Sequence, residues 1–219
     1  MRANRLVLAI TTSVCLILTP PELAAQVASE ASEVLLSRPA WRDVPESTLR
    51  AIAARLETPS RVREFAELCE QTGILQNNIR QIAGSGPADA DYVLGMIAAT
   101  LTSYGNGLGD QARFREAGRV LEFAVMLKPR HVPAWISLAL VAVNTGDCRG
   151  AVQWADKVLN FKPDPNSDDE WERGAAAALT REGEKEAADA LGEPDAIGAW
   201  QQMQQQMRLI KDHCSQQRD

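Results

Sequence analysis

The sequence has only two histidines, His131 and His213, and it lacks the motifs that build common catalytic centres. No H-x-x-x-H, no G-x-S-x-G and no Cys–His pairing by motif occurs. His131 is expected in a turn between helical units, and His213 stands beside Cys214 near a helix end. A nucleophilic pair made of these two would need a third group and a pocket. We therefore expect a protein that is not an enzyme and that uses no cofactor.

A block of basic residues is also missing. The chain has 23 Lys and Arg against 29 Asp and Glu, which gives a formal net charge of −6. Proteins that bind nucleic acid need a basic footprint to neutralise phosphates. Anionic membrane surfaces likewise attract clusters of Lys and Arg. The charge pattern thus favours a protein or peptide partner over nucleic acid or a lipid surface.

Cysteine is scarce, and its spacing predicts no metal site. Of the four cysteines, Cys15 lies in the N-terminal apolar run, and the other three form no C-x-x-C pair. Three cysteines allow either one disulfide with one free thiol or three buried thiols. Cys69 and Cys148 stand where core residues are expected, which favours buried thiols at both positions. A Cys148–Cys214 disulfide requires the last helix to fold back onto the preceding helices.

The sequence begins like a secretory signal peptide. A basic start, MRANR, precedes a mostly apolar run over residues 6–19, then Pro20-Pro21 and small residues that include Ala25. The run is shorter than the roughly 20 residues that span a bilayer. We expect residues 1–25 to be a bacterial leader and the mature protein to be periplasmic or secreted, without membrane insertion. The alternative is that the leader is kept as an anchor.

A period of 34 residues organises the middle of the chain. Sliding residues 111–163 against themselves by this distance superposes small and helix-breaking positions. The matching pairs are Phe114 and Cys148, Ala117 and Ala151, Ala124 and Val158, Val125 and Leu159, and Pro129 and Pro163. A fixed period of this size is typical of stacked helical hairpins, because one hairpin cannot bury its own apolar face.

The second copy carries the clearer pattern. Trp135, Leu138 and Ala139 share one helical face, Gly146 ends the helix, and Ala151 provides a close contact between helices. This pattern, closed by Pro163, resembles the tetratricopeptide repeat. The resemblance implies an all-α fold, a short solenoid of helical hairpins, and a family of modules that bind other proteins. It names no partner.

The chain divides into a leader, helical units and a final helix. Residues 1–25 are the leader, and residues 26–87 are either a helical cap or decayed repeats. Trp171 and Ala187 have the same separation as Trp135 and Ala151, which indicates a third, degenerate unit. The expected repeats are therefore 88–130, 132–164 and 166–194, and a capping helix covers 195–214.

The segment YGNGLGD, residues 104–110, is expected to be a long turn between the two helices of the first repeat. The spacing of the second unit recurs at Leu94, Ile97, Ala98 and Leu101. This copy lies seven residues further from the second unit than the 34-residue period allows, and the glycine-rich segment accounts for these seven residues. A phosphate-binding loop is excluded, because the glycines follow a helix and no Lys-Ser/Thr comes after them.

The resemblance also implies where a partner binds. In this family the first helix of each hairpin lines the concave surface, which in the second unit gives the residues Pro133, Ile136, Ser137, Leu140, Val143 and Asn144. The family's carboxylate clamp uses Lys and Asn where this chain has Ile136 and Leu140, so that clamp is not supported. The mostly apolar set suits an apolar helix or extended peptide. The alternative is that these side chains pack against the N-terminal helices.

Two functions remain open from the sequence. The first is an exported interaction module or adaptor that holds an apolar peptide or protein face in the groove. The second is a structural subunit that self-associates in an envelope assembly, through the 104–110 segment or the Gln- and Met-rich last helix.

Overall fold

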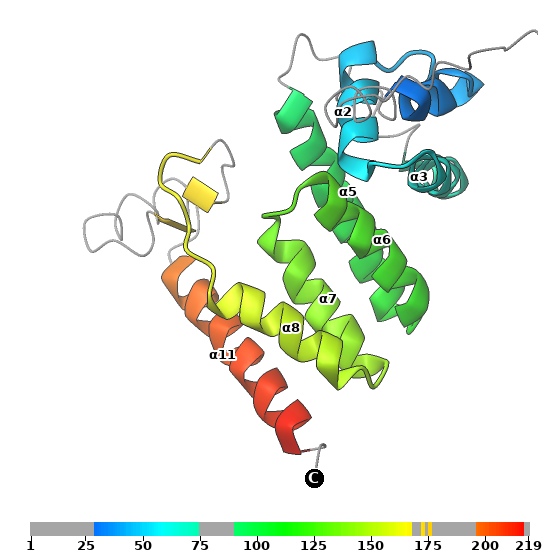
Figure 1. Cartoon of the computed structure of the whole chain (residues 1–219). Helices are drawn as coiled ribbons and strands as arrows, with labels where there is room; N and C mark the ends of the chain where they lie inside the picture. Colours follow the sequence, from blue (N-terminus) through cyan, green and yellow to red (C-terminus); the bar gives the residue numbers. More distant parts are fainter. Residues whose placement is uncertain (1–28, 75–89, 168–171, 174, 177–195, 217–219) are drawn as a thin grey trace, which may run out of the picture.

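All regular structure in the described residues is helical (Figure 1). The structure is a computed structural model that describes residues 29–74, 90–167, 172–173, 175–176 and 196–216. No strand occurs within these ranges. The predicted all-α class is confirmed. The leader 1–25, the segment 75–87 and most of the degenerate unit 166–194 lie outside the described residues.

The N-terminal part consists of helical residues 29–36, the 3₁₀ helix η1 (Pro39–Trp41), α2 (Glu46–Leu56) and α3 (Pro59–Thr72). The apolar stripe of α2 and the apolar stripe of α3 are both fully buried. Helix α3 begins at a proline, where a missing N–H costs nothing, and the Thr58 side chain caps it by accepting a hydrogen bond from the Arg61 backbone N–H (3.3 Å). It ends at Gly73, whose φ of 71° suits glycine.

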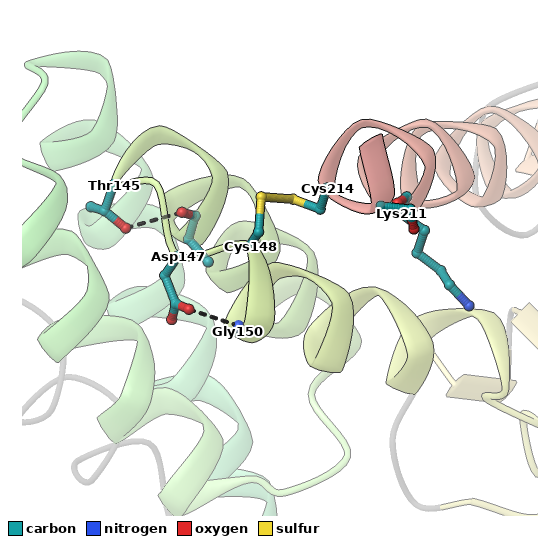
Figure 2. The surroundings of a disulfide bond; sticks show 8 residues. Thr145, Asp147, Cys148, Gly150, Lys211 and Cys214 are labelled. Atoms are coloured by element: carbon teal, nitrogen blue, oxygen red, sulfur yellow. Dashed lines mark hydrogen bonds between the residues drawn. A yellow bond between two sulfur atoms is a disulfide. The ribbon is translucent and has the colours of Figure 1, made fainter. Parts of the chain in front are cut away.

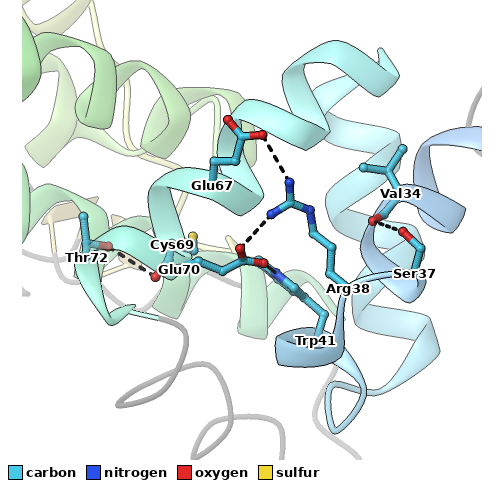
Figure 3. A network of polar contacts seen from close by, with 8 residues as sticks. All are labelled: Val34, Ser37, Arg38, Trp41, Glu67, Cys69, Glu70 and Thr72. Atoms are coloured by element: carbon cyan, nitrogen blue, oxygen red, sulfur yellow. Dashed lines mark hydrogen bonds and ion pairs between the residues drawn. The ribbon is translucent and has the colours of Figure 1, made fainter.

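A polar network fastens η1 and its N-cap residue, Arg38, to α3 (Figure 3). The Arg38 guanidinium donates to Glu70 at 2.7 Å and to Glu67 at 3.2 Å, and the Trp41 indole N–H donates to the other Glu70 oxygen at 3.1 Å. Trp41 itself is fully buried against Phe65, with ring centroids 5.8 Å apart. An aromatic side chain can be buried in this way because its polar N–H has a partner.

The next two helices, α5 (Ala90–Asp110) and α6 (Phe114–Leu127), form a tightly packed pair. The expected turn over 104–110 is wrong, because α5 remains helical through all three glycines. Gly105 explains why: a Cβ at this position would lie 2.8 Å from Leu121 Cγ. The glycine therefore lets the backbones of α5 and α6 approach closely, and this packing outweighs its poor helix propensity.

Two charged contacts join α5 and the turn after α6 to more distant parts of the chain. Asp91 accepts from Lys128 Nζ at 2.8 Å and from Arg55 of α2 at 3.2 Å. Arg130 pairs with Glu172, whose side chain is only 3% exposed, and also donates to the Lys162 carbonyl at 3.1 Å. Asp91 thus links α2, α5 and the end of α6, and Arg130 fixes the segment that follows α8.

The helices α7 (Val132–Asn144) and α8 (Cys148–Leu159) form the next pair, and α11 (Ala196–Gln216) packs on α8 and α7. Figure 1 shows α6, α7, α8 and α11 following one another across the molecule. The α7–α8 turn closes with Gly146 at a φ of 76°, and Asp147 caps α8 by accepting from the Gly150 N–H at 2.9 Å. Trp135 and Ala151 belong to the same core, as the repeat pattern requires.

The buried side chains form two clusters. One contains residues of the N-terminal helices, α5 and α6, and the other contains residues of α7, α8 and α11. Val125 of α6 packs against both clusters and marks their boundary. The second cluster includes Trp200, Met207 and Ile210, which the sequence places on the apolar side of the last helix.

Candidate functional site

A groove of about 570 Å³ opens between α5, the start of α6 and α7. One wall belongs to α7 and is mostly apolar, whereas the facing wall belongs to the last two turns of α5 and carries small residues. The residues that line it are Gly105, Asn106, Gly109, Asp110, Phe114, Pro133, Ile136, Ser137, Leu140, Val141 and Asn144. A volume of this size lies within the range of ligand sites.

The groove exists because the two walls differ in side-chain size. A Cβ placed at Gly109 would have no atom within 4 Å, so the space beside this residue stays unfilled, whereas Gly105 is packed against Leu121 of α6. The α7 side supplies the larger residues Ile136 and Leu140, which are half-buried and pack against the second core cluster. The result is a shallow apolar surface that water reaches.

Five of the six residues predicted for the partner groove line this cavity. Ile136, Ser137, Leu140 and Asn144 lie along it, together with Pro133, whereas Val143 is not among its lining residues. Val143 instead packs against the second core cluster. The alternative in which these side chains meet the N-terminal helices does not describe the lining set, because the facing wall comes from α5 and α6.

The polar residues of the groove are turned toward their own helix. The Ser137 hydroxyl donates to the Pro133 carbonyl at 3.0 Å, and the Asn144 side-chain amide donates to the Leu140 carbonyl at 2.8 Å. These two donors are therefore already used within α7. Among the described lining residues Asp110 is the one charged side chain, so the lining is otherwise uncharged.

A second cleft, of about 370 Å³, lies between α3, α5 and α6. Its lining includes the apolar residues Leu68 and Phe123, and an ion pair between Arg119 of α6 and Glu64 of α3 (2.5 Å) crosses it. Sequence reasoning missed this cleft, because it depends on how α3 is placed against α6. The helical periodicity of each segment carries no information about that placement.

The cysteines differ from the favoured sequence interpretation at one position. Cys69 is a buried thiol, and burial raises its pKa, with a further contribution from the charge of Glu70. Cys148, which we expected to be a buried thiol, instead forms a disulfide with Cys214, with Cα atoms 5.0 Å apart (Figure 2). The last helix folds back onto α8, which is the condition that this pairing required.

Comparisons with known proteins give no match: no family model matches the chain, no curated protein matches it, and no solved structure matches it. The 34-residue register therefore rests on the residues and the packing of this chain alone.

Within the described ranges, His, Cys, Asp and Glu side chains form no group of three that could hold a metal ion. In the same part of the chain, no helix is long and apolar enough to cross a membrane.

Proposed function

We propose that this protein is a short helical solenoid similar to tetratricopeptide-repeat proteins, and that it binds an apolar segment of another protein in the α5–α7 groove. The single observation that carries the proposal is the clustering of Ile136, Leu140 and Phe114 at a groove that water reaches. Large apolar side chains gathered at an open concave surface are typical of binding sites.

The packing pattern supports the solenoid. Helix α5 contacts α6 and α7, α6 contacts α7, and α7 contacts α8, so each helix touches its next neighbour and the first helices of the two pairs also touch. Helix α6 begins at Phe114 and α8 at Cys148, and these residues are one repeat period apart. Stacked helical hairpins produce this pattern of contacts.

The hydrogen bonds of the groove favour a helical occupant over an extended one. An extended peptide needs partners for its backbone N–H and C=O groups, whereas a helix satisfies its own. The Ser137 hydroxyl and one of the two N–H groups of the Asn144 amide already donate to carbonyls of α7, so the mostly apolar α7 wall offers an extended backbone few partners. The bound segment is therefore an amphipathic helix whose apolar face contacts Ile136 and Leu140.

We further propose that the protein is exported through the leader 1–25. The Cys148–Cys214 disulfide supports this compartment, because disulfides form and persist in oxidising environments. In the cytosol, thiol-based reductants keep such a pair reduced.

A photo-crosslinker placed at residue 136, with a matched crosslinker at residue 209, tests the groove. Leu209 lies on α11, away from the groove, and is 61% exposed. Crosslinking in an envelope extract should yield a partner adduct from residue 136 and none from residue 209. The adduct from residue 136 should be lost when Leu140→Glu is added to the crosslinker-bearing chain, provided that thermal unfolding shows this variant to be folded.

Other results would count against the groove. Equal adducts from both positions, or an adduct that persists in the folded Leu140→Glu variant, would show that the groove does not select a partner. An adduct with the mass of two chains would support the alternative, a self-associating subunit of an envelope assembly. Light scattering of the purified protein separates these cases, since the adaptor hypothesis predicts a monomer.

A further inference from the structure

The disulfide occupies a distinctive place in the fold. It joins Cys148, the first residue of α8, to Cys214 in the last turn of α11, and so connects two segments that are 66 residues apart in sequence (Figure 2). Helix α11 is the last helix of the described chain and covers one face of α8 and α7. The covalent link therefore fastens the C-terminal end of α11, a helix that we call the cap, to the start of α8.

The other contacts of α11 with α8 are of two kinds. Trp200, Met207 and Ile210 are buried in the second core cluster. Lys211 pairs with Asp156 at 2.5 Å, but both side chains are more than one-third exposed, so this ion pair contributes little. Apolar burial is then the main non-covalent force that keeps the cap in place.

The first core cluster is built without any residue of α11. Its members belong to the N-terminal helices, α5, α6 and the first turn of α7. Loss of the cap would therefore remove buried contacts from the second cluster and leave the first cluster intact. This separation allows local opening without global unfolding.

We propose that the Cys148–Cys214 disulfide is a redox-sensitive latch for α11: a dithiol reductant opens it, and α11 then undocks reversibly while α5, α6 and the N-terminal helices stay folded. With the latch closed, α11 covers the apolar face of α7 and α8. With the latch open, this face, which includes Trp135 and Val158, becomes accessible to solvent. The proposal is independent of the groove, whose lining residues do not include α11.

The chemistry follows from the exposure of the two cysteine residues. Cys148 is half-buried and Cys214 is fully buried, so an incoming thiolate reaches Cys148 first. It forms a mixed disulfide with Cys148, the bond between the two protein sulfurs breaks, and Cys214 leaves as a thiolate that takes a proton from water. The second thiol of the reductant then displaces Cys148. The protein disulfide is reduced to two thiols, and the dithiol is oxidised to its disulfide.

Hydrogen exchange of the full chain with and without dithiothreitol tests the latch. Reduction should accelerate amide exchange in residues 196–216 by at least about tenfold, with the loop-closure entropy setting an upper bound of about a thousandfold. Exchange in α5 and α6 should stay unchanged, and reoxidation should restore protection of the cap. Unchanged protection in 196–216 after reduction would overturn the proposal, and so would loss of protection in α5 and α6.

Two variants serve as controls. Cys148→Ser/Cys214→Ser should show the open pattern without reductant and should not respond to dithiothreitol. Cys69→Ala changes the remaining described cysteine and should respond to the reductant as the natural chain does. If the double variant loses protection in α5 and α6, the disulfide supports the whole fold and is not a latch.

Discussion

Replacing Gly105 by alanine tests the close packing of α5 on α6. An alanine Cβ at this site would lie 2.8 Å from Leu121 Cγ and 2.9 Å from Cδ2, distances that require the buried Leu121 to move. Overpacking of this kind costs about 1–3 kcal/mol. Better helix propensity returns up to about 1 kcal/mol. We expect Gly105→Ala to lower the free energy of unfolding by up to about 2 kcal/mol.

Gly107→Ala is the matched control, because no atom lies within 4 Å of a Cβ placed there. It should stabilise the protein by about 0.5–1 kcal/mol, since it has only the helix-propensity gain. Urea unfolding of both variants measures the difference, which should be about 1–3 kcal/mol with Gly105→Ala the less stable. Equal stabilisation by both substitutions would refute the packing argument. No stabilisation at Gly107 would instead support a turn over 104–110.

Three further predictions concern single side chains. The hydrogen bond from Lys128 lowers the pKa of Asp91, and the charge of Arg55 lowers it further. The stability that ionised Asp91 contributes should therefore be present at neutral pH and lost as the pH falls below about 4. In Asp91→Asn, the free energy of unfolding should change less with pH in this range. Arg130→Gln should lower the free energy of unfolding, measured in urea, by about 1–3 kcal/mol, because it leaves the buried Glu172 carboxylate without its cation. An unchanged midpoint of urea unfolding would show that the Arg130–Glu172 ion pair does not stabilise the fold. Cys69 should resist iodoacetamide in the folded, oxidised chain and react only in denaturant, as mass spectrometry would show.

Much of the fold follows from local patterns in the sequence. The stripes of α2 and α3 are buried as their spacing predicts, and Thr58 with Pro59 begins α3 because both the cap and the first helical position have strong residue preferences. The apolar side of α11 is buried at Trp200, Met207 and Ile210 for the same reason. In each case a single helix determines the outcome.

The error at 104–110 has a different origin. Glycine is a weak helix former, and three in six residues predict a break, but Gly105 is selected by its contact with Leu121 of another helix. The 34-residue period itself indicates that α5 continues to Asp110. Helix α5 ends at Asp110 and α7 at Asn144, one period apart, and the same shift places Gly105 on Ala139. If the 34-residue period is applied without an insertion, residues 104–110 align with the end of α7, and α5 is predicted to be helical through them.

The candidate site was only partly accessible to sequence reasoning. The α7 wall of the groove follows from helical periodicity, whereas the α5 wall includes glycines for which the sequence predicts a turn. The sequence predicts the Cys148–Cys214 disulfide only if the last helix folds back onto the preceding helices. No pattern within α11 shows which helices it packs against. The cleft beside α3 required the packing of helices that share no repeat register.

The two clusters of buried side chains divide the tryptophans of the described chain. Trp41 lies in the cluster of the N-terminal helices, while Trp135 and Trp200 belong to the other cluster and Trp154 packs against it. The molecule therefore carries its own fluorescent probes for each half. A variant that keeps only Trp41 would report on the N-terminal cluster, and a variant that lacks only Trp41 would report on the other cluster. Their emission spectra during thermal unfolding would show which cluster unfolds first.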